Sequence, residues 1–173
     1  STFLKVLEEK KLDIDEYYLF ASSNSKGKKI TFMDKEYTVE ELTHDTPKLG
    51  FTYALFSAGA TISKEYAKEF VANGTIVIDN SSAFRMDEDV PLVVPEVNPE
   101  EIFNNHGIIA NPNCSTIQAV VPLKILDDLY TIKRIVYSTY QAVSGAGQKG
   151  IADLENGLKG ESPKKFPYSI VNN

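Results

Sequence analysis

The order of apolar segments constrains this chain most, because short strand-like runs alternate with helix-like stretches. The strand-like runs span 53–57, 75–79 and 107–110, and an apolar stripe at helical spacing occupies 63–73 between the first two. An order of β, α, β implies parallel strands joined by crossover connections. The sequence therefore predicts an α/β fold with a parallel sheet, in which ligands bind at the carboxyl ends of the strands.

Further elements are expected on both sides of this unit. In chain order they are a helix opening at Phe3–Leu7, a buried strand at 17–21, a hairpin of 29–32 and 36–39, a helix at 115–130, a long β-branched strand at 132–143 and a helix at 147–158. Pro122 is expected to kink the helix at 115–130 or to lie near its first turn. We place a domain boundary near Asn111, with a first domain over 1–112 and the beginning of a second over 113–173.

Small polar residues follow four of the predicted strands. These loops are Ser22–Ser25, Ser57–Gly59, Asn80–Ser82 and Asn111–Cys114. Because the carboxyl ends of parallel strands share one edge, the four loops are expected to meet on one rim of the sheet.

The composition excludes several classes of protein. The chain has 18 basic and 24 acidic residues and a net charge of −6, which disfavours non-specific nucleic-acid binding. No apolar run approaches the roughly 20 residues that span a bilayer, and the charged opening segment does not resemble a signal peptide. A single cysteine excludes a disulfide framework and a cysteine-rich zinc site, so we expect no metal and a cytoplasmic setting.

Cys114 is the sharpest candidate for chemistry, because it directly precedes a predicted apolar helix. A thiol there meets the positive end of the helix dipole and backbone N–H groups, which favour the thiolate and stabilise an oxyanion. The alternative is a small buried hydrophobe, the usual role of a lone cysteine. His44 and His106, the two histidines, both look like surface turn residues. No convincing Cys–His pair can be built, so either the general base lies outside this chain or the site is not complete.

Arg85 lies just past a predicted strand and beside two serines, a position that suits capture of a phosphate or carboxylate. Its plain alternative is a surface ion pair with Asp87 or Glu88. The small residues of 144–147 allow a backbone to approach a ligand closely, or form an ordinary β-to-α turn. The lysines within 26–29 either hold an anionic group or form a solvated cluster.

Taken together, these segments resemble aspartate-semialdehyde dehydrogenase. The matching strings run in order along essentially the whole chain: LFASSNSKGKK, ALFSAG, VIDNSSAFRMDEDVPLVVPEVN, IIANPNCSTIQ, VYSTYQAVSGAGQKG and FPYSIVNN. The resemblance implies a Rossmann-type parallel-sheet domain that binds NADP, followed by the start of an α/β catalytic and dimerisation domain. It implies reversible conversion of L-4-aspartyl phosphate to L-aspartate 4-semialdehyde and phosphate, on the route to lysine (through diaminopimelate), methionine and threonine, in a homodimer or tetramer.

The resemblance also implies roles for individual residues. Cys114 would be the nucleophile that forms an acyl-thioester, and Gln141 would orient the substrate beside it. Arg85 and Asn113 would contact substrate or phosphate. The cofactor contacts would be Ser25, Ser57, Ala58, Gly59, Ser144 and Gly145.

Three departures from the family pattern matter. The family's Gly-rich phosphate turn would precede Ser1, and its catalytic histidine and further basic residues would follow Asn173. We therefore treat the chain as a piece of a longer protein that is inactive alone, with a processed natural N-terminus as the alternative. Where the family often has an arginine facing the 2′-phosphate of NADP, this chain has Asn24. Lys26 or Lys28 would replace it electrostatically, without its bidentate fork.

Rival functions remain open at this point. One is the sister reductase that acts on N-acetyl-glutamyl phosphate by the same cysteine chemistry. Another is a non-catalytic binding module in which Cys114 is buried packing. A cysteine hydrolase is weaker, because no histidine is placed to serve it.

Overall fold

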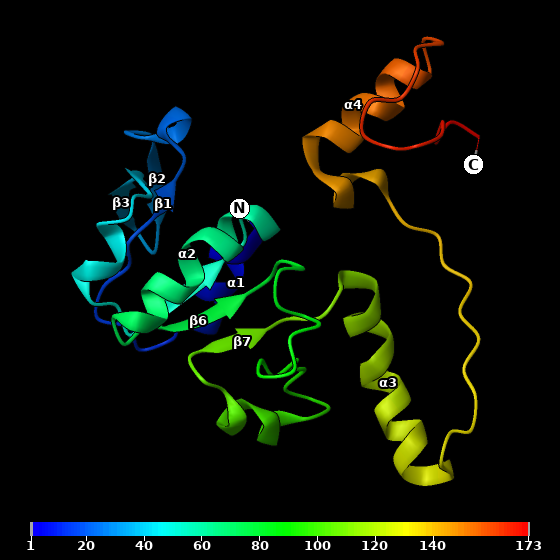
Figure 1. The fold of residues 1–173 in the computed structure, drawn as a ribbon, viewed down its shortest axis with the longest axis horizontal. Helices are drawn as coiled ribbons and strands as arrows, with labels where there is room; N and C mark the ends of the chain where they lie inside the picture. Colours follow the sequence, from blue (N-terminus) through cyan, green and yellow to red (C-terminus); the bar gives the residue numbers. More distant parts are fainter. Residues whose placement is uncertain (1, 173) are drawn as a thin grey trace. The chain divides into compact units, whose positions relative to one another are not determined.

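The computed structural model describes residues 2–172, and the chain forms two compact units, Ser1–Val121 and Pro122–Asn173. Figure 1 shows the secondary structure of each unit. The predicted boundary between 112 and 113 concerns functional domains and stays a prediction.

A three-stranded parallel sheet lies at the centre of the first unit. Its strands, in spatial order, are β5 (Tyr53–Phe56), β6 (Ile76–Asp79) and β7 (Ile108–Ala110), and α2 (Ala60–Ala72) connects the first two. Each strand matches a predicted one, and the parallel α/β arrangement is confirmed. The helix begins three residues before the predicted start and ends at Ala72. Asn73 is its C-cap, and Gly74 after it adopts a left-handed conformation (φ 83°), as the sequence predicts.

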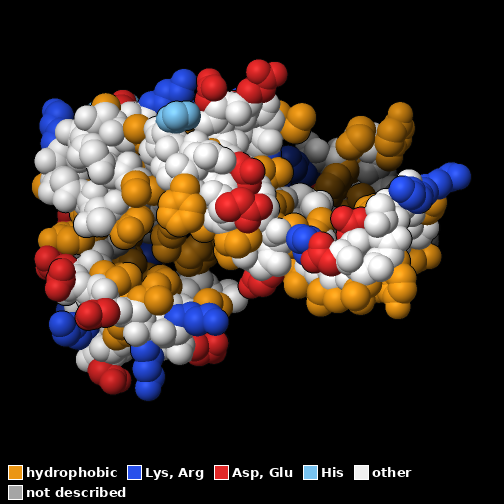
Figure 2. All heavy atoms as spheres, turned by 90° about the horizontal axis from the view of Figure 1, so that it is seen from below, with side chains coloured by type: hydrophobic (Ala, Val, Ile, Leu, Met, Phe, Trp, Pro, Cys, Tyr) orange, Lys and Arg blue, Asp and Glu red, His pale blue; other side chains and the backbone are white. Residues whose placement is uncertain are grey.

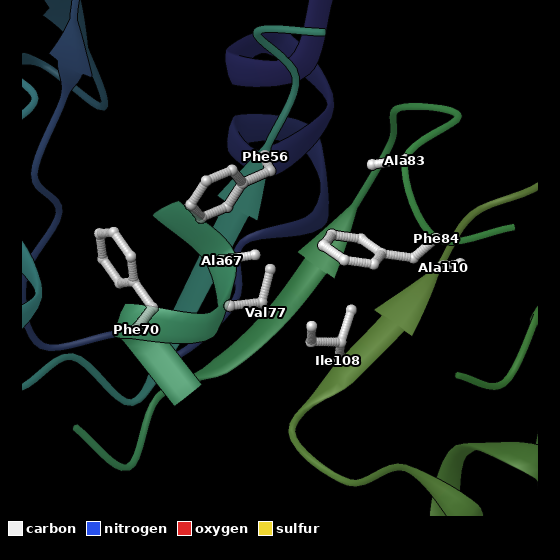
Figure 3. Close-up of a cluster of buried hydrophobic side chains, with 8 residues drawn as sticks. All are labelled: Phe56, Ala67, Phe70, Val77, Ala83, Phe84, Ile108 and Ala110. Carbon is white, nitrogen blue, oxygen red and sulfur yellow. The ribbon is translucent and has the colours of Figure 1, made fainter. Parts of the chain in front are cut away.

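The core of this unit fills the space between α2, the sheet and the loop after β6 (Figure 3). Ala67 and Phe70 face it from α2 at a spacing of three residues, which places them on one side of the helix. Phe84 enters from the loop after β6 and is buried. Burial of a phenylalanine side chain stabilises a fold by about 1.5–3 kcal/mol. Phe84 therefore holds the loop that carries the neighbouring Arg85.

Two short ladders complete the strands of the first unit. β1 (Phe20–Ala21) pairs in parallel with β4 (Glu40–Glu41), and β2 (Lys29–Phe32) pairs antiparallel with β3 (Lys35–Thr38). The hairpin is confirmed, and its two-residue turn has positive φ at Met33 and Asp34, as a type I′ turn requires. The strand predicted over 17–21 shortens to β1 and is half-buried.

The helices outside the sheet agree with the predictions, apart from short 3₁₀ turns. The remaining elements are α1 (Thr2–Lys10), α3 (Cys114–Tyr130), α4 (Gly147–Gly157), and the 3₁₀ helices η1 (Ser23–Ser25), η2 (Thr46–Leu49), η3 (Pro99–Asn104) and η4 (Val143–Ala146). Pro122 lies inside α3, in its third turn rather than near its first. No helix among residues 2–172 combines the length and apolar character needed to cross a membrane.

The long strand predicted over 132–143 is wrong. Residues 131–142 form an extended stretch without a strand partner among the described residues (Figure 1). Val136 and Tyr140 are largely exposed, and hydrophobic side chains are visible at the surface in Figure 2. A β-branched pattern gives a segment strand propensity, but a strand also needs a neighbouring edge to accept its backbone hydrogen bonds.

The second unit contains one buried acid, Asp153 on α4. Its two carboxyl oxygens accept hydrogen bonds from the backbone N–H groups of Lys164 (2.9 Å), Lys165 (2.7 Å) and Phe166 (2.9 Å). Burial raises the pKa of Asp153, but these hydrogen bonds outweigh it and hold the pKa below its ordinary value. Asp153 thus fixes the segment after α4 against the helix.

A first prediction concerns Gly107, which precedes β7 with φ +100°. A Cβ at this position would lie 2.5 Å from Cγ1 of Val71, whereas a Cβ on Gly74 (φ +83°) meets open space. Gly74→Ala therefore carries only backbone strain of about 1 kcal/mol. Gly107→Ala adds a steric collision, so we expect it to lower the free energy of unfolding by about 2–4 kcal/mol in urea titrations.

The double variant Gly107→Ala with Val71→Ala isolates the collision. It is expected to recover part of the loss, because the colliding methyl groups are gone, although Val71→Ala has a packing cost of its own. Equal losses for Gly107→Ala and Gly74→Ala would contradict the steric argument.

Candidate active site

Three polar loops lie at the carboxyl edge of the parallel sheet. The loops 57–59, 80–82 and 111–114 follow β5, β6 and β7, which are neighbours in one sheet. The fourth predicted loop, 22–25, follows β1, which pairs only with β4 among the described strands. The expectation that four loops share one rim is therefore correct for three of them.

Hydrogen bonds join these three loops to one another. The N–H of Asn80 donates to the carbonyl of Phe56 (2.8 Å), and the N–H of Asn111 donates to the carbonyl of Asp79 (2.8 Å). In addition, Nδ2 of Asn111 donates to Oδ1 of Asn80 at 2.6 Å. The pairing of the strands thus continues into the loops and fixes their relative positions.

Arg85 bridges two of the loops. Its Nε donates to the carbonyl of Asn111 (2.9 Å) and its Nη2 to the carbonyl of Asn80 (3.4 Å), and the side chain is half-buried. No ion pair between Arg85 and Asp87 or Glu88 occurs in the described structure, so the surface-pair alternative is wrong. Two neutral carbonyl groups orient the guanidinium plane and leave its positive charge uncompensated by a carboxylate.

Cys114 is the first residue of α3 and is exposed. The alternative of a buried packing cysteine is therefore wrong. Its helix is capped by Asn113, whose Oδ1 accepts hydrogen bonds from the N–H groups of Ser115 (2.9 Å) and Thr116 (3.3 Å). Cys114 and Arg85 both lie beside the loop that follows β7, since Arg85 contacts Asn111, three residues before the thiol.

Capping by Asn113 limits which N–H groups could stabilise an oxyanion, and it gives Asn113 a structural role. The first-turn N–H groups of Ser115 and Thr116 are engaged by Asn113, so these two are not available to an oxyanion. Capping by Asn113 was missed, although asparagine directly before a helix is a strong N-cap signal. The predicted contact between Asn113 and substrate is not tested by this geometry.

The loop after β5 forms the start of α2. Gly59 has φ +95°, and the space where its Cβ would be is open. Ser57 and Ala58 are exposed beside it. A bare backbone at a helix N-terminus suits the close approach of a phosphate group, so the residues present fit the phosphates of a dinucleotide.

The lysines of 26–29 differ in their partners. Lys26 pairs with Glu41 (3.2 Å) and Lys29 pairs with Glu36 (2.5 Å). Lys28 makes no ion pair within residues 2–172, and its Nζ lies 3.5 Å from Oγ of Ser25. Lys28 is thus the cation of this cluster that stands beside the predicted cofactor residue.

Gln141 and Gly145 lie together in the second unit. A Cβ on Gly145 would be 3.0 Å from Nε2 of Gln141, so the glycine leaves room for the carboxamide. Ser144 and Gly145 belong to η4, which opens directly into α4. Gln141 and Cys114 belong to different units, and their predicted proximity stays a prediction.

The histidines lie where the sequence predicts, at the surface. Nδ1 of His44 is 2.8 Å from Glu69, and its ring stacks on Tyr66 at 4.9 Å. His106 is exposed and precedes β7, at the end of the strand opposite to Cys114. Among the described residues, no three His, Cys, Asp or Glu side chains gather closely enough to hold a metal ion.

A buried polar cluster, which the sequence patterns do not predict, lies at the end of β6. The carboxyl group of Asp79 accepts hydrogen bonds from Oγ of Ser63 (2.6 Å), and from N (3.1 Å) and Oγ (2.7 Å) of Ser81. Asp79 and Ser63 are completely buried. Ser63 was interpreted as the start of a helix. The available signal was a serine in the same helical register as buried Ala67 and Phe70.

Comparisons with known proteins agree with this arrangement. A model described as "Semialdehyde dehydrogenase, NAD binding domain" matches residues 1–105. An aspartate-semialdehyde dehydrogenase of Aquifex aeolicus is 58% identical over 99% of this chain. A crystal structure of aspartate semialdehyde dehydrogenase II from Vibrio cholerae, complexed with ASA, is 43% identical over 99% of this chain with a TM-score of 0.85. The Candida albicans enzyme with NADP is 30% identical over 75% of the chain, with a TM-score of 0.62.

The chain spans about half the length of these relatives. It covers 53% of the Aquifex aeolicus protein, 53% of the Vibrio cholerae chain and 44% of the Candida albicans chain. The similarity therefore establishes the fold and family of this segment, and the activity of the whole protein requires a separate argument.

A second prediction separates the capping role of Asn113 from the rest of its chemistry. Asn113→Ala removes the acceptor for the N–H groups of Ser115 and Thr116, so we expect thermal or urea unfolding to show a loss of about 1 kcal/mol. Asn113→Asp keeps the acceptor and adds negative charge at the helix N-terminus, which preserves stability. If both variants lose the same free energy of unfolding, Asn113 does not act as a cap.

Proposed function

The chain belongs to the semialdehyde dehydrogenase family, and from this premise we propose that its protein converts L-4-aspartyl phosphate reversibly to L-aspartate 4-semialdehyde and phosphate with NADP(H). The observation that carries the proposal is an exposed cysteine at the capped N-terminus of α3, beside an arginine without a carboxylate partner. The names and identities of the relatives support aspartate as the substrate class.

Cys114 performs the covalent step in this proposal. Its thiolate attacks the acyl carbon of aspartyl phosphate, a C–S bond forms, the bond between the acyl carbon and the bridging oxygen breaks, and phosphate leaves. The nicotinamide cofactor, when bound, supplies a hydride to the thioester carbon. The thiohemiacetal then collapses, which releases the aldehyde and returns the thiolate.

Arg85 serves the anionic part of the substrate. Its Nε and Nη2 are engaged by carbonyl groups, and no described residue accepts a hydrogen bond from Nη1. A guanidinium held in this way presents a fixed donor and a full positive charge to a phosphate or carboxylate. Gln141 orients the substrate beside the thiol, and Asn113 adds a contact through its amide group. A side-by-side assay against N-acetyl-glutamyl phosphate separates this function from that of the sister reductase.

The proposed cofactor contacts come from both units of the chain. Ser57, Ala58 and Gly59 hold the cofactor phosphates at the start of α2, and Ser144 and Gly145 add further contacts to the cofactor. We also propose that NADP is preferred over NAD, because Lys28 and Ser25 offer a cation and a hydroxyl within 3.5 Å of each other for the 2′-phosphate. Asn24, in place of an arginine, lies beside them in η1. A cytoplasmic homodimer or tetramer is the assembly proposed for the whole protein.

A third prediction tests the nucleophile. In the full-length protein, Cys114→Ala and Cys114→Ser are expected to abolish phosphate-dependent formation of NADPH from aspartate semialdehyde, because no thioester can form. Wild-type protein should lose activity on alkylation by iodoacetamide at the same rate as Cys114 is labelled. The 173-residue chain alone is expected to show no turnover. Clear activity of either variant would refute the assignment of Cys114.

A fourth prediction tests the cofactor preference. Lys28→Ala is expected to raise KM for NADP about fivefold to tenfold and to leave KM for NAD almost unchanged, since only NADP carries the 2′-phosphate. Lys29→Ala is the matched control, because that lysine is already paired with Glu36. Equal changes of KM for the two cofactors would contradict a role of Lys28 at the 2′-phosphate.

A further inference from the structure

Asp79 is an unusual residue to find in the core of this unit. It is 0% exposed at the last position of β6, and it makes no ion pair with any described cation. Burial of a carboxyl group is costly unless hydrogen bonds replace its water. Three donors do so, and they come from only two residues, Ser63 and Ser81.

These bonds close the turn that follows β6. Oγ of Ser81 donates to Oδ2 of Asp79 and at the same time accepts a hydrogen bond from the N–H of Ala83 (3.0 Å). The N–H of Ser81 donates to Oδ1 of Asp79. Both oxygens of Asp79 are thus tied to the turn, and residues 79–83 have one hydrogen-bonded conformation.

The same carboxyl group ties this turn to α2. Oγ of Ser63 donates to Oδ1 at 2.6 Å, which is the shortest of the three contacts. Ser63 lies in the first turn of α2, and its own N–H donates to the carbonyl of Gly59 (3.1 Å). One acid therefore connects the loop assigned to the cofactor with the loop that leads to Arg85.

The orientation of the Arg85 side chain depends on this turn. Phe84 is fixed in the core, and the guanidinium reaches back to the carbonyl of Asn80, inside the turn, and across to that of Asn111. If the turn shifts, the carbonyl of Asn80 moves, and Asn111 follows because its side chain is bonded to Asn80.

We infer that Asp79 is a positioning residue, which through Ser63 and Ser81 sets the orientation of Arg85 toward its anionic substrate. The inference rests on the proposed function, because it takes Arg85 as the substrate-binding arginine. A purely structural role for Asp79 would affect stability alone. A positioning role also affects the substrate affinity that Arg85 provides.

The test uses Ser63→Ala and Ser81→Ala in the full-length protein, since each removes a donor and keeps the acid. We expect KM for phosphate and for aspartate semialdehyde to rise by roughly twofold to tenfold, the effect of losing one hydrogen bond. We expect kcat to change little in both variants, and KM for NADP to change little in Ser81→Ala, where the bond between Ser63 and Asp79 remains. Ser81→Thr keeps the hydroxyl and is expected to restore KM.

Thr75→Val is the matched control. Thr75 is buried just before β6, at the end opposite to Asp79, and its hydroxyl has no hydrogen-bond partner in the described structure. Valine has the same shape, so stability is expected to stay equal or rise, and KM for phosphate is expected to remain that of the wild type.

A second readout does not depend on activity. In protein labelled with 15N-arginine, the Nε proton of Arg85 is assigned by its loss in Arg85→Lys, and its exchange with solvent reports the bond to Asn111. We expect faster exchange in both serine-to-alanine variants and no change in Thr75→Val.

The two readouts separate the possible failures. A wild-type protein without turnover of aspartate semialdehyde would refute the proposed function. The exchange rate of the Arg85 proton would still decide whether Asp79 orients Arg85. With an active wild type, an unchanged KM in Ser63→Ala and Ser81→Ala overturns the inference. Unchanged exchange of the Arg85 proton in both variants also overturns it.

Discussion

The parallel pairing of β5, β6 and β7 is the constraint on which the rest of the first unit depends. Neighbouring parallel strands end at the same edge of the sheet. The loops that follow them therefore lie together although they are far apart in the sequence. Each ladder also extends one residue beyond the strand, through the N–H groups of Asn80 and Asn111. The positions of Arg85 and of the first turn of α3 are consequences of this pairing, because both follow directly from these loops.

Much of this arrangement could be predicted from the sequence. The apolar runs at 53–57, 75–79 and 107–110 identify the strands, and their alternation with an amphipathic helix identifies the parallel sheet. The hairpin and the Asn73-Gly74 cap follow from local patterns of the same kind. Local signals of this type are reliable here because each element packs against a neighbour that the described chain contains.

Other features needed information that local patterns do not carry. The segment 132–143 has the residues of a strand, but pairing depends on an edge elsewhere in space, and the described residues provide none. The bond between Ser63 and Asp79 joins positions 16 residues apart, and no local pattern in either element indicates that they pair. Arg85 has acidic residues nearby in the sequence, yet its guanidinium donates to carbonyl groups of the rim. The tertiary structure determines these partners, so a local pattern does not predict them.

The carbonyl partners of Arg85 have an electrostatic consequence for the site. The chain carries a net charge of −6, so an exposed arginine has many carboxylates with which it could pair. A carboxylate partner would neutralise its charge and compete with an anionic substrate, whereas a carbonyl orients the guanidinium and leaves the charge in place. The half-buried position of Arg85 lowers the local dielectric and strengthens its attraction for an incoming anion. Held by the carbonyl groups of Asn80 and Asn111, this arginine combines a fixed direction with an unpaired charge, and the phosphate capture that we propose beside Cys114 would require both.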